Sequence, residues 1–168
     1  MPRTVAEVVV KGEHMDFALF NTHLAFHSRE EQIRQIQYLN GLRDQIIDKA
    51  KAASFEETEG PYVYNNNIQA ALLCGDLNVD SNSDDFKTYI VDQQWVDCWF
   101  TQNKSTHFEK NTRQPTCGCF DATQWSQGPH VRDYFLATDN IAHQTVKVAV
   151  DVNTDASDHQ PVFLEINL

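Results

Sequence analysis

The chain has 168 residues, of which 41% are hydrophobic and 22% charged. This length suits one domain and is short for two, and the composition excludes collagen-like, low-complexity and wholly disordered proteins. No apolar run approaches the roughly 18 residues of a membrane span, and residues 1–20 lack the apolar block of a signal peptide. We therefore expect a protein without a membrane span.

The chain is acidic, with 24 acidic residues against 13 basic ones and a formal net charge of −11. Proteins that hold duplex nucleic acid by its phosphates usually present a basic face. The basic residues of the stretch 29–51 are interleaved with acidic ones, so no basic cluster stands out. Charge therefore disfavours duplex nucleic acid as a partner, although it does not exclude a local basic groove.

The four cysteines are too few and too scattered for a disulfide scaffold. Cys117 and Cys119 form one close pair, whereas a structural zinc site usually needs two pairs of ligands. We interpret all four as reduced, partly buried thiols, which are typical of a cytoplasmic protein.

The N-terminal segment predicts two strands and a long helix. Residues 4–11 are rich in valine, residues 12–14 suit a turn, and the apolar run 17–20 leads into Asn21-Thr22-His23-Leu24. Strands joined by a short glycine-containing loop usually pair antiparallel. An amphipathic helix is expected from about Ser28 to Ala53, because Ser28 begins a capping box and apolar residues then recur at helical spacing, at Ile33, Ile36, Leu39, Leu42, Ile46 and Ala50.

The rest of the chain predicts short strands and one further helix. Residues 54–67 are polar and suggest a loop, and the stretch 101–130 is irregular. Ser81 to Ser83 can cap a helix that ends before Trp95. Strands are expected at 70–74, which is apolar throughout and suits burial on both faces, and at 133–137, 145–152 and 161–166. This order of strands and helices predicts an α/β fold in a single domain.

Seven polar residues stand at the ends of the predicted strands: Asn21, His23, Asp76, Asn78, Asp133, Asp158 and His159. Ligands of α/β proteins bind outside strand ends, so these side chains are expected to converge. Carboxylate and amide oxygens suit Mg²⁺, Mn²⁺ or Ca²⁺, and a histidine beside them can act as an acid, a base or a donor to phosphate charge. The pattern favours metal-assisted hydrolysis of a phosphate ester.

Each of these residues alone also fits a plain structural role. Asp76 and Asn78 can form an ordinary turn pair, and His23 and His159 can be buried histidines whose hydrogen bonds are satisfied within the core. Their joint pattern is what favours a functional site.

Four motifs carry a family resemblance: Asn21-Thr22-His23-Leu24, Gly75-Asp76-Leu77-Asn78, Arg132-Asp133-Tyr134-Phe135 and Ser157-Asp158-His159-Gln160-Pro161-Val162. In this order they resemble the endonuclease/exonuclease/phosphatase superfamily, to which deoxyribonuclease I belongs. The resemblance implies part of a four-layer α/β sandwich, with a mixed sheet and flanking helices. It also implies hydrolysis of a phosphodiester or phosphomonoester with Mg²⁺ or Mn²⁺, the substrate being DNA, RNA, a phospholipid, an inositol phosphate or another ester.

The resemblance implies metal ligands and a base. Asp76, Asn78 and Asp158 are the expected metal ligands. Asp76 is also expected to orient or deprotonate the attacking water, Asn78 to hold a phosphate oxygen, and Asp158 alternatively to pair with a histidine.

The other three roles also come from the resemblance. His159 is expected to contact the scissile phosphate and His23 to stabilise the transition state. Asn21 would support the phosphate-facing loop, and Asp133 would orient one of the active-site histidines.

One part of the family pattern cannot be placed. Family members carry an asparagine and a metal-binding glutamate on two strands before the Asn-Thr-His motif, whereas 20 residues precede Asn21 here, and Glu7 and Glu13 have the wrong context. We therefore expect residues 1–168 to form an incomplete domain with weak or no activity. The alternative is a catalytically inert binding or interaction module on the same scaffold.

An incomplete sandwich is expected to expose apolar strand faces and to associate into a small homo-oligomer. The residues expected on these faces occupy alternating strand positions: Val8, Val10, Phe17, Leu19, Val162 and Leu164.

Overall fold

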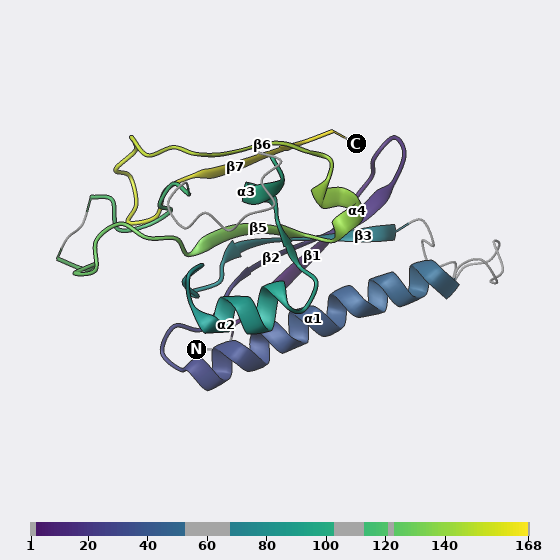
Figure 1. The fold of residues 1–168 in the computed structure, drawn as a ribbon, viewed down its shortest axis with the longest axis horizontal. Helices are drawn as coiled ribbons and strands as arrows, with labels where there is room; N and C mark the ends of the chain where they lie inside the picture. The colour runs from purple at the N-terminus through teal and green to yellow at the C-terminus, as the bar shows by residue number, and fades with distance from the viewer. Residues whose placement is uncertain (1–2, 53–67, 103–112, 121–122, 168) are drawn as a thin grey trace.

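The computed structural model describes residues 3–52, 68–102, 113–120 and 123–167 (Figure 1). A central sheet separates two layers: α1 and α2 cover one face, and a β-hairpin with two short helices covers the other. The predicted loop 54–67 and residues 103–112 and 121–122 of the irregular stretch 101–130 lie outside the described residues. Across the described ranges, no helix combines the length and apolar character needed to cross a membrane.

The central sheet has five strands in the order β1-β2-β3-β5-β4. Their bounds are Val5–Val10 for β1, Asp16–His23 for β2, Ile68–Asp76 for β3, Val96–Asp97 for β4 and Asp133–Ala137 for β5. β1 and β2 form the predicted antiparallel hairpin. β2 and β3 are parallel, and β3 and β5 are antiparallel.

The register of these strands brings three motifs to one end of the sheet. His23 is the partner of Asp76 across the β2–β3 pair, and Asp76 is the partner of Asp133 across the β3–β5 pair. Parallel neighbours such as β2 and β3 end at the same edge, and the antiparallel β5 begins there. Residues 23, 76 and 133 are therefore neighbours, although they are far apart in the sequence.

Helix α1 (Arg29–Ala52) agrees closely with the predicted helix. The Ser28 hydroxyl accepts a hydrogen bond from the Glu31 amide at 3.2 Å, as expected for an N-cap. Ile36, Leu39 and Ile46 are buried against the sheet, because helical spacing places them on one face.

The second predicted helix is divided into two short turns. Helix α2 (Asp84–Phe86) is capped by the Ser83 hydroxyl, and a π-helical turn follows at Lys87–Val91. Phe86 and Ile90 are buried in the same core as α1. A polar contact follows these turns: the indole N–H of Trp95 donates to the side-chain oxygen of Asn40 in α1 at 2.8 Å.

The opposite layer contains a second, two-stranded antiparallel sheet made of β6 (Thr145–Val150) and β7 (Val162–Ile166). Helices α3 (Cys98–Thr101) and α4 (Asp139–Ala142) lie between this hairpin and the central sheet (Figure 1). Alternation along β3 explains both cores, since Ala71 and Leu73 face α1 whereas Ala70 and Leu72 face the hairpin layer.

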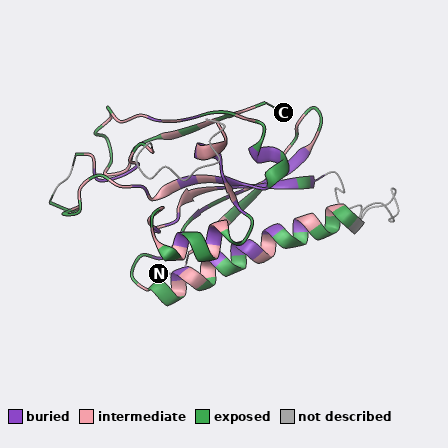
Figure 2. Cartoon of the chain, in the orientation of Figure 1, coloured by how far each residue is buried: buried purple, intermediate pink, exposed green. Residues whose placement is uncertain are grey.

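The expected apolar faces are largely covered by this second layer. Phe17 is buried there, and Val10, Leu19, Val162 and Leu164 are partly buried in the same cluster. Val8 differs, since 55% of its surface is exposed. Figure 2 shows that β6 and β7 consist mostly of half-buried and exposed residues. Self-association of the chain stays a prediction.

Candidate functional site

The carboxylate of Asp76 lies between two histidines. Its Oδ2 atom is 3.3 Å from Nε2 of His23 and 3.7 Å from Nε2 of His159. Asp76 is the last residue of β3 and His23 the last of β2, so both belong to the strands, although the sequence pattern placed them just after. His159 comes from the loop between β6 and β7.

Asp133 holds His159 in place from the other side of its ring. The Nδ1–H group of His159 donates to Oδ2 of Asp133 at 2.8 Å. The same carboxylate oxygen accepts a hydrogen bond from the hydroxyl of the buried Thr116 at 2.7 Å. Because Nδ1 is engaged, Nε2 of His159 is the nitrogen that faces Asp76.

Asn78 adopts a strained backbone conformation beside this group. Its φ angle is +53°, in the left-handed region that asparagine tolerates. Its backbone amide donates to Oδ1 of Asp76 at 2.8 Å, and its side-chain amide donates to the Leu24 carbonyl at 3.0 Å. These bonds fix the turn after β3 and leave the amide oxygen of Asn78 as an acceptor.

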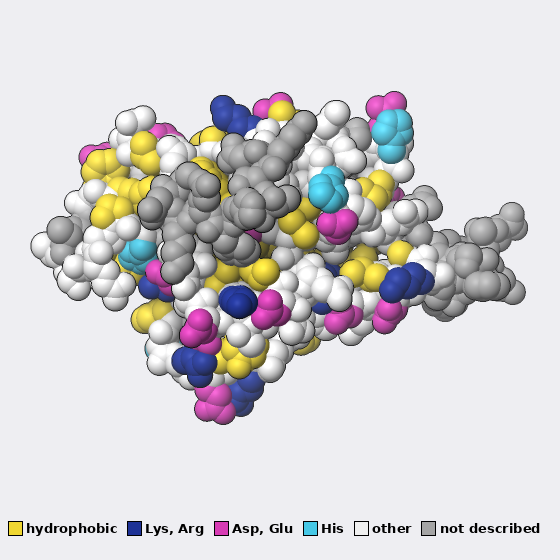
Figure 3. All heavy atoms as spheres, viewed as in Figure 1, with side chains coloured by type: hydrophobic (Ala, Val, Ile, Leu, Met, Phe, Trp, Pro, Cys, Tyr) yellow, Lys and Arg dark blue, Asp and Glu magenta, His cyan; other side chains and the backbone are white. Residues whose placement is uncertain are grey.

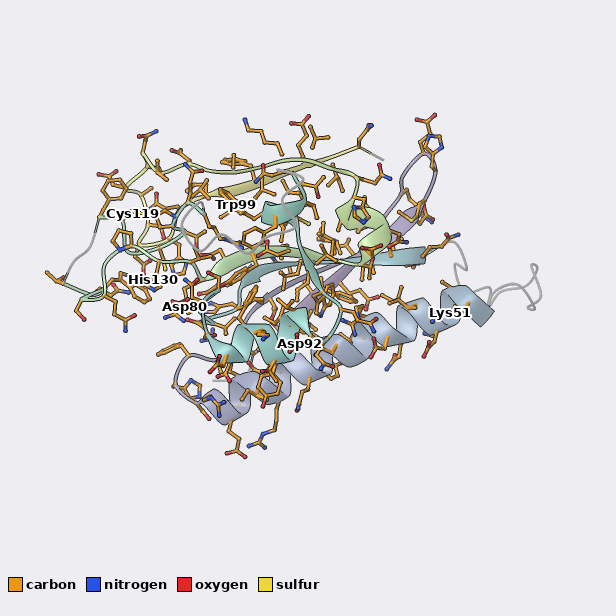
Figure 4. All side chains as sticks on the ribbon, in the orientation of Figure 1. Lys51, Asp80, Asp92, Trp99, Cys119 and His130 are labelled. Carbon is orange, nitrogen blue, oxygen red and sulfur yellow. The ribbon has the colours of Figure 1, made fainter. Side chains whose placement is uncertain are left out.

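These residues line a depression of about 380 Å³, together with side chains from two loops. Its lining comprises His23, Phe26, Asp76, Asn78, Gln124, Trp125, Arg132, Asp158 and His159. Trp125 meets the rings of His130 and His159 edge-on, at centroid distances of 4.8 and 6.1 Å. Figure 4 places His130 at the end of the molecule opposite Lys51, which lies near the C-terminal end of α1.

The structure thus gathers five of the seven predicted residues on one surface: His23, Asp76, Asn78, Asp158 and His159. Asp133 stands behind His159 and contacts it directly. Asn21 lies inside β2, and its side chain donates to the Cys74 sulfur at 3.2 Å, so it is outside this lining. Asp158 accepts a hydrogen bond from Gln124 at 2.8 Å.

A larger cavity, of about 520 Å³, lies between β1 and the first half of α1. Glu31 is the one acidic side chain of its lining, and no histidine lines it. Because acid–base chemistry needs titratable groups that share a substrate, the smaller depression around Asp76 is the better candidate site.

Burial and pairing shift the two central pKa values. Burial raises the pKa of Asp76, and the neighbouring Asp133 charge adds to this, although the Asn78 amide and both histidines oppose it. The pKa of His159 is raised above 6.5, mainly by its hydrogen bond to Asp133 and against the opposing effect of burial. The result is a carboxylate with increased basicity beside an imidazole that favours its charged form.

The site also suits a divalent cation. Asp76, Asp133 and His159 each offer one ligand atom, and these atoms lie within 4.8 Å of one another. Asp133 and His159 already bind each other, whereas the predicted ligands Asp76, Asn78 and Asp158 all line the depression and carry oxygen atoms of the kind that a hard cation prefers. The raised pKa of Asp76 indicates a poorly solvated negative charge, which a cation would offset.

Several residues of this site were not predicted from the sequence. Thr116, Gln124 and Trp125 come from the irregular stretch 101–130, where no periodicity or motif marks them. Phe26 is 73% exposed and follows the Asn-Thr-His-Leu motif by two residues. Arg132 had the clearest signal, since it stands inside one of the four motifs.

The sequence from residue 24 to 159 matches the model of the Endonuclease/Exonuclease/phosphatase family. The chain belongs to this family. The match contains Asp76, Asn78, Asp133, Asp158 and His159, and it begins just after His23. Among curated proteins, none matches the chain by sequence.

Three solved structures share the family fold with this chain. A conserved protein of unknown function from Enterococcus faecalis V583 is 21% identical, with a TM-score of 0.56 over 92% of this chain and 51% of that one. The 3′ phosphatase NExo from Neisseria, bound to a product DNA hairpin, is 14% identical, with a TM-score of 0.58 over 96% and 65% of the two chains. An AP endonuclease from Archaeoglobus fulgidus is 17% identical, with a TM-score of 0.54 over 100% and 72%.

At these identities the likeness concerns the fold, and it confirms the predicted α/β architecture of the deoxyribonuclease I type. The chain spans about half the length of the Enterococcus protein.

Proposed function

We propose that this chain hydrolyses phosphate esters with the help of Mg²⁺ or Mn²⁺. The observation that carries the proposal is the position of Asp76 Oδ2, at 3.3 Å from His23 Nε2 and 3.7 Å from His159 Nε2 in a shared depression. A carboxylate flanked by two imidazoles supplies an acceptor for a water proton and donors for phosphoryl charge. Membership of a phosphoesterase family supports this interpretation.

Asp76 is the residue that activates water in this proposal. Its Oδ1 is held by the Asn78 amide, so Oδ2 faces the depression and can accept a proton from a water molecule. Burial raises the pKa of the carboxylate and so makes it a stronger base. As the oxygen of that water bonds to phosphorus, the ester oxygen leaves on the opposite side and takes its proton from solvent.

The two histidines stabilise the charge that develops on the phosphoryl oxygens. Asp133 orients the His159 ring and favours its charged form, so Nε2–H of His159 can donate to a phosphoryl oxygen. His23 approaches Asp76 from the β2 side and provides a second donor. Donors that are fixed before the reaction stabilise such charge without having to reorganise.

Asp76, Asn78 and Asp158 would hold the cation, with oxygen atoms suited to Mg²⁺ or Mn²⁺. A cation bound there would polarise phosphoryl oxygens and lower the pKa of water. Slow hydrolysis is expected, since two carboxylates line the depression and a hard cation prefers several oxygen ligands.

Monoesters and diesters are both candidate substrates. The Neisseria structure is that of a 3′ phosphatase with a DNA product, and the Archaeoglobus one is that of an AP endonuclease. The net charge of −11 disfavours a long duplex, and Figure 3 shows acidic and basic side chains mixed, without a broad basic patch on the face in view. A small ester, or one at the end of a chain, fits this surface better.

The test is hydrolysis of p-nitrophenyl phosphate and bis-p-nitrophenyl phosphate with Mg²⁺, with Mn²⁺ and with a chelator. Turnover is expected with either cation and not with the chelator. Asp76→Asn should lower the rate at least about 100-fold, the usual range for loss of a general base.

Asp80→Asn is the matched control, because Asp80 follows Asp76 by four residues, lies outside the depression and accepts a hydrogen bond from the Asn82 amide that asparagine can also accept. The proposal fails if neither ester is hydrolysed, which is the behaviour of an inert binding module. It also fails if Asp76→Asn leaves the rate unchanged.

A further inference from the structure

Arg132 brings a positive charge into this acidic depression. It precedes Asp133, and its side chain lines the surface that also contains Asp76 and Asp158. One guanidinium nitrogen, Nη1, donates to the Asn78 carbonyl at 2.9 Å. The Nε–H group is buried and has no hydrogen-bond partner within the described residues.

Most other described arginines are paired with a carboxylate. Ion pairs join Arg29 to Asp85, Arg34 to Glu30, Arg43 to Asp44 and Arg113 to Asp97. Throughout the described ranges, no carboxylate lies within ion-pair distance of Arg132. In a chain with 24 acidic residues against 13 basic ones, an arginine without an acidic partner is informative.

The chemistry of the guanidinium identifies the missing partner. Arginine has five N–H donors in a planar fork, no acceptor, and a charge that persists at any physiological pH. The fork matches the oxygens of a phosphate as well as those of a carboxylate. A buried donor without a partner costs free energy that an added acceptor can recover, and Arg132 is one of the residues that line the depression.

We propose that Arg132 is a substrate-binding residue that contacts the phosphoryl oxygens of the ester. This inference rests on the proposed function. Asp76 and Asp158 repel a phosphate that enters the depression, and Arg132 offsets this repulsion with a permanent charge. Its bond to the Asn78 carbonyl fixes the guanidinium relative to the turn that carries Asp76. A phosphate bound to Arg132 is therefore held close to the catalytic carboxylate.

The probe is inorganic phosphate, and its dissociation constant is measured by NMR titration of the metal-free chain. Arg132→Gln should weaken phosphate binding about tenfold or more, because a charge-assisted hydrogen bond is lost, and Arg132→Lys should recover part of the affinity. Arg34→Gln is the matched control, since it removes the same charge from an exposed pair on α1. Its dissociation constant should equal that of the unmodified chain.

A bracing role alone gives a different result. If Arg132 only supports Asn78, Arg132→Gln lowers the melting temperature and leaves phosphate affinity unchanged, and the inference is wrong. Absence of phosphate binding by the unmodified chain also overturns it. Should Arg132→Gln not fold, arginine modification by phenylglyoxal replaces the variant: phosphate should slow modification of Arg132 but not of Arg34, and equal rates at Arg132 with and without phosphate contradict the inference.

The two proposals fail separately. If hydrolysis depends on Asp76 but phosphate affinity does not depend on Arg132, the inference is wrong and the proposed phosphoesterase function is retained. Phosphate binding that depends on Arg132, without any hydrolysis, supports the inference and refutes the function.

Discussion

Gly75 is the position where a single methyl group is expected to disturb the site most. It precedes Asp76 in β3 and is the partner of Thr22 in β2. Its φ angle is +128°, and a Cβ atom built on it would lie 1.9 Å from the Thr22 carbonyl oxygen. Glycine therefore permits both the backbone conformation and the close approach of the two strands.

The cost of Gly75→Ala has two parts. Holding an alanine at this φ angle costs about 1–3 kcal/mol, and forcing a methyl group against backbone atoms costs about 1–3 kcal/mol more. Their sum, about 2–6 kcal/mol, is a large part of the roughly 5–15 kcal/mol that stabilises an ordinary domain. Relief requires β2 to retreat by about 1.5 Å to restore van der Waals contact, which would also separate His23 from Asp76.

Urea unfolding, followed by circular dichroism, measures this cost. Gly41→Ala is the matched control: its Cβ would meet nothing within 4 Å, and alanine is favoured over glycine inside a helix by up to about 1 kcal/mol. The two variants should therefore shift the free energy of unfolding in opposite directions. A Gly75→Ala protein within about 0.5 kcal/mol of the unmodified chain, the usual spread of a neutral surface change, would refute this reasoning.

Three further substitutions test the site and its support. Asp133→Asn should lower the pKa of His159, because the carboxylate is the main cause of its raised value; an NMR titration that shows no decrease contradicts the pairing. In the unmodified chain, that pairing stabilises the fold fully below about pH 6.5 and is lost as the pH rises through the folded pKa. Asp76→Asn should lower the rate at least about 100-fold yet keep or raise the melting temperature at neutral pH, because a raised carboxylate pKa means that the charged form opposes folding there; a marked decrease in the melting temperature is the contrary result. Arg113→Leu should cost about 3–5 kcal/mol, since it leaves Asp97 charged and unpaired in a site where the two side chains are 7% and 4% exposed; denaturant unfolding of a variant with unchanged stability would count against it.

Local patterns in the sequence predicted the regular elements well. Apolar spacing and the Ser28 cap predicted α1 to within a residue or two, and short apolar runs predicted most strands. Strand β4 and helices α3 and α4 have two to four residues each, so they are too short to show a periodic pattern of apolar residues. The second helix was expected to be continuous, and its change to a π-helical turn at Lys87–Val91 has no marker in the sequence.

The composition of the site was easier to predict than its geometry. Motifs indicated Asp76, His159 and Asp133, but strand order and direction decide which side chains meet, and these depend on contacts between distant segments. The resemblance gave Asp133 a histidine partner without saying which, and the structure identifies His159. Thr116 could not be found, because a buried hydroxyl that serves one carboxylate leaves no sequence pattern.

The division of the site between two separately hydrogen-bonded sheets has a consequence for local opening of the protein. β2, α1 and β3 are consecutive along the chain and bring His23 to Asp76, whereas His159 arrives only when the loop between β6 and β7 docks. That loop is joined to the rest by few backbone hydrogen bonds, such as Gln160 to Thr116 at 2.7 Å and Gly118 to Asp158 at 3.1 Å. Segments held by few hydrogen bonds open at a lower free-energy cost than a sheet does. We therefore expect the His159 imidazole to leave the site before the central sheet and α1 unfold, so the chain can lose its chemistry while it keeps that scaffold.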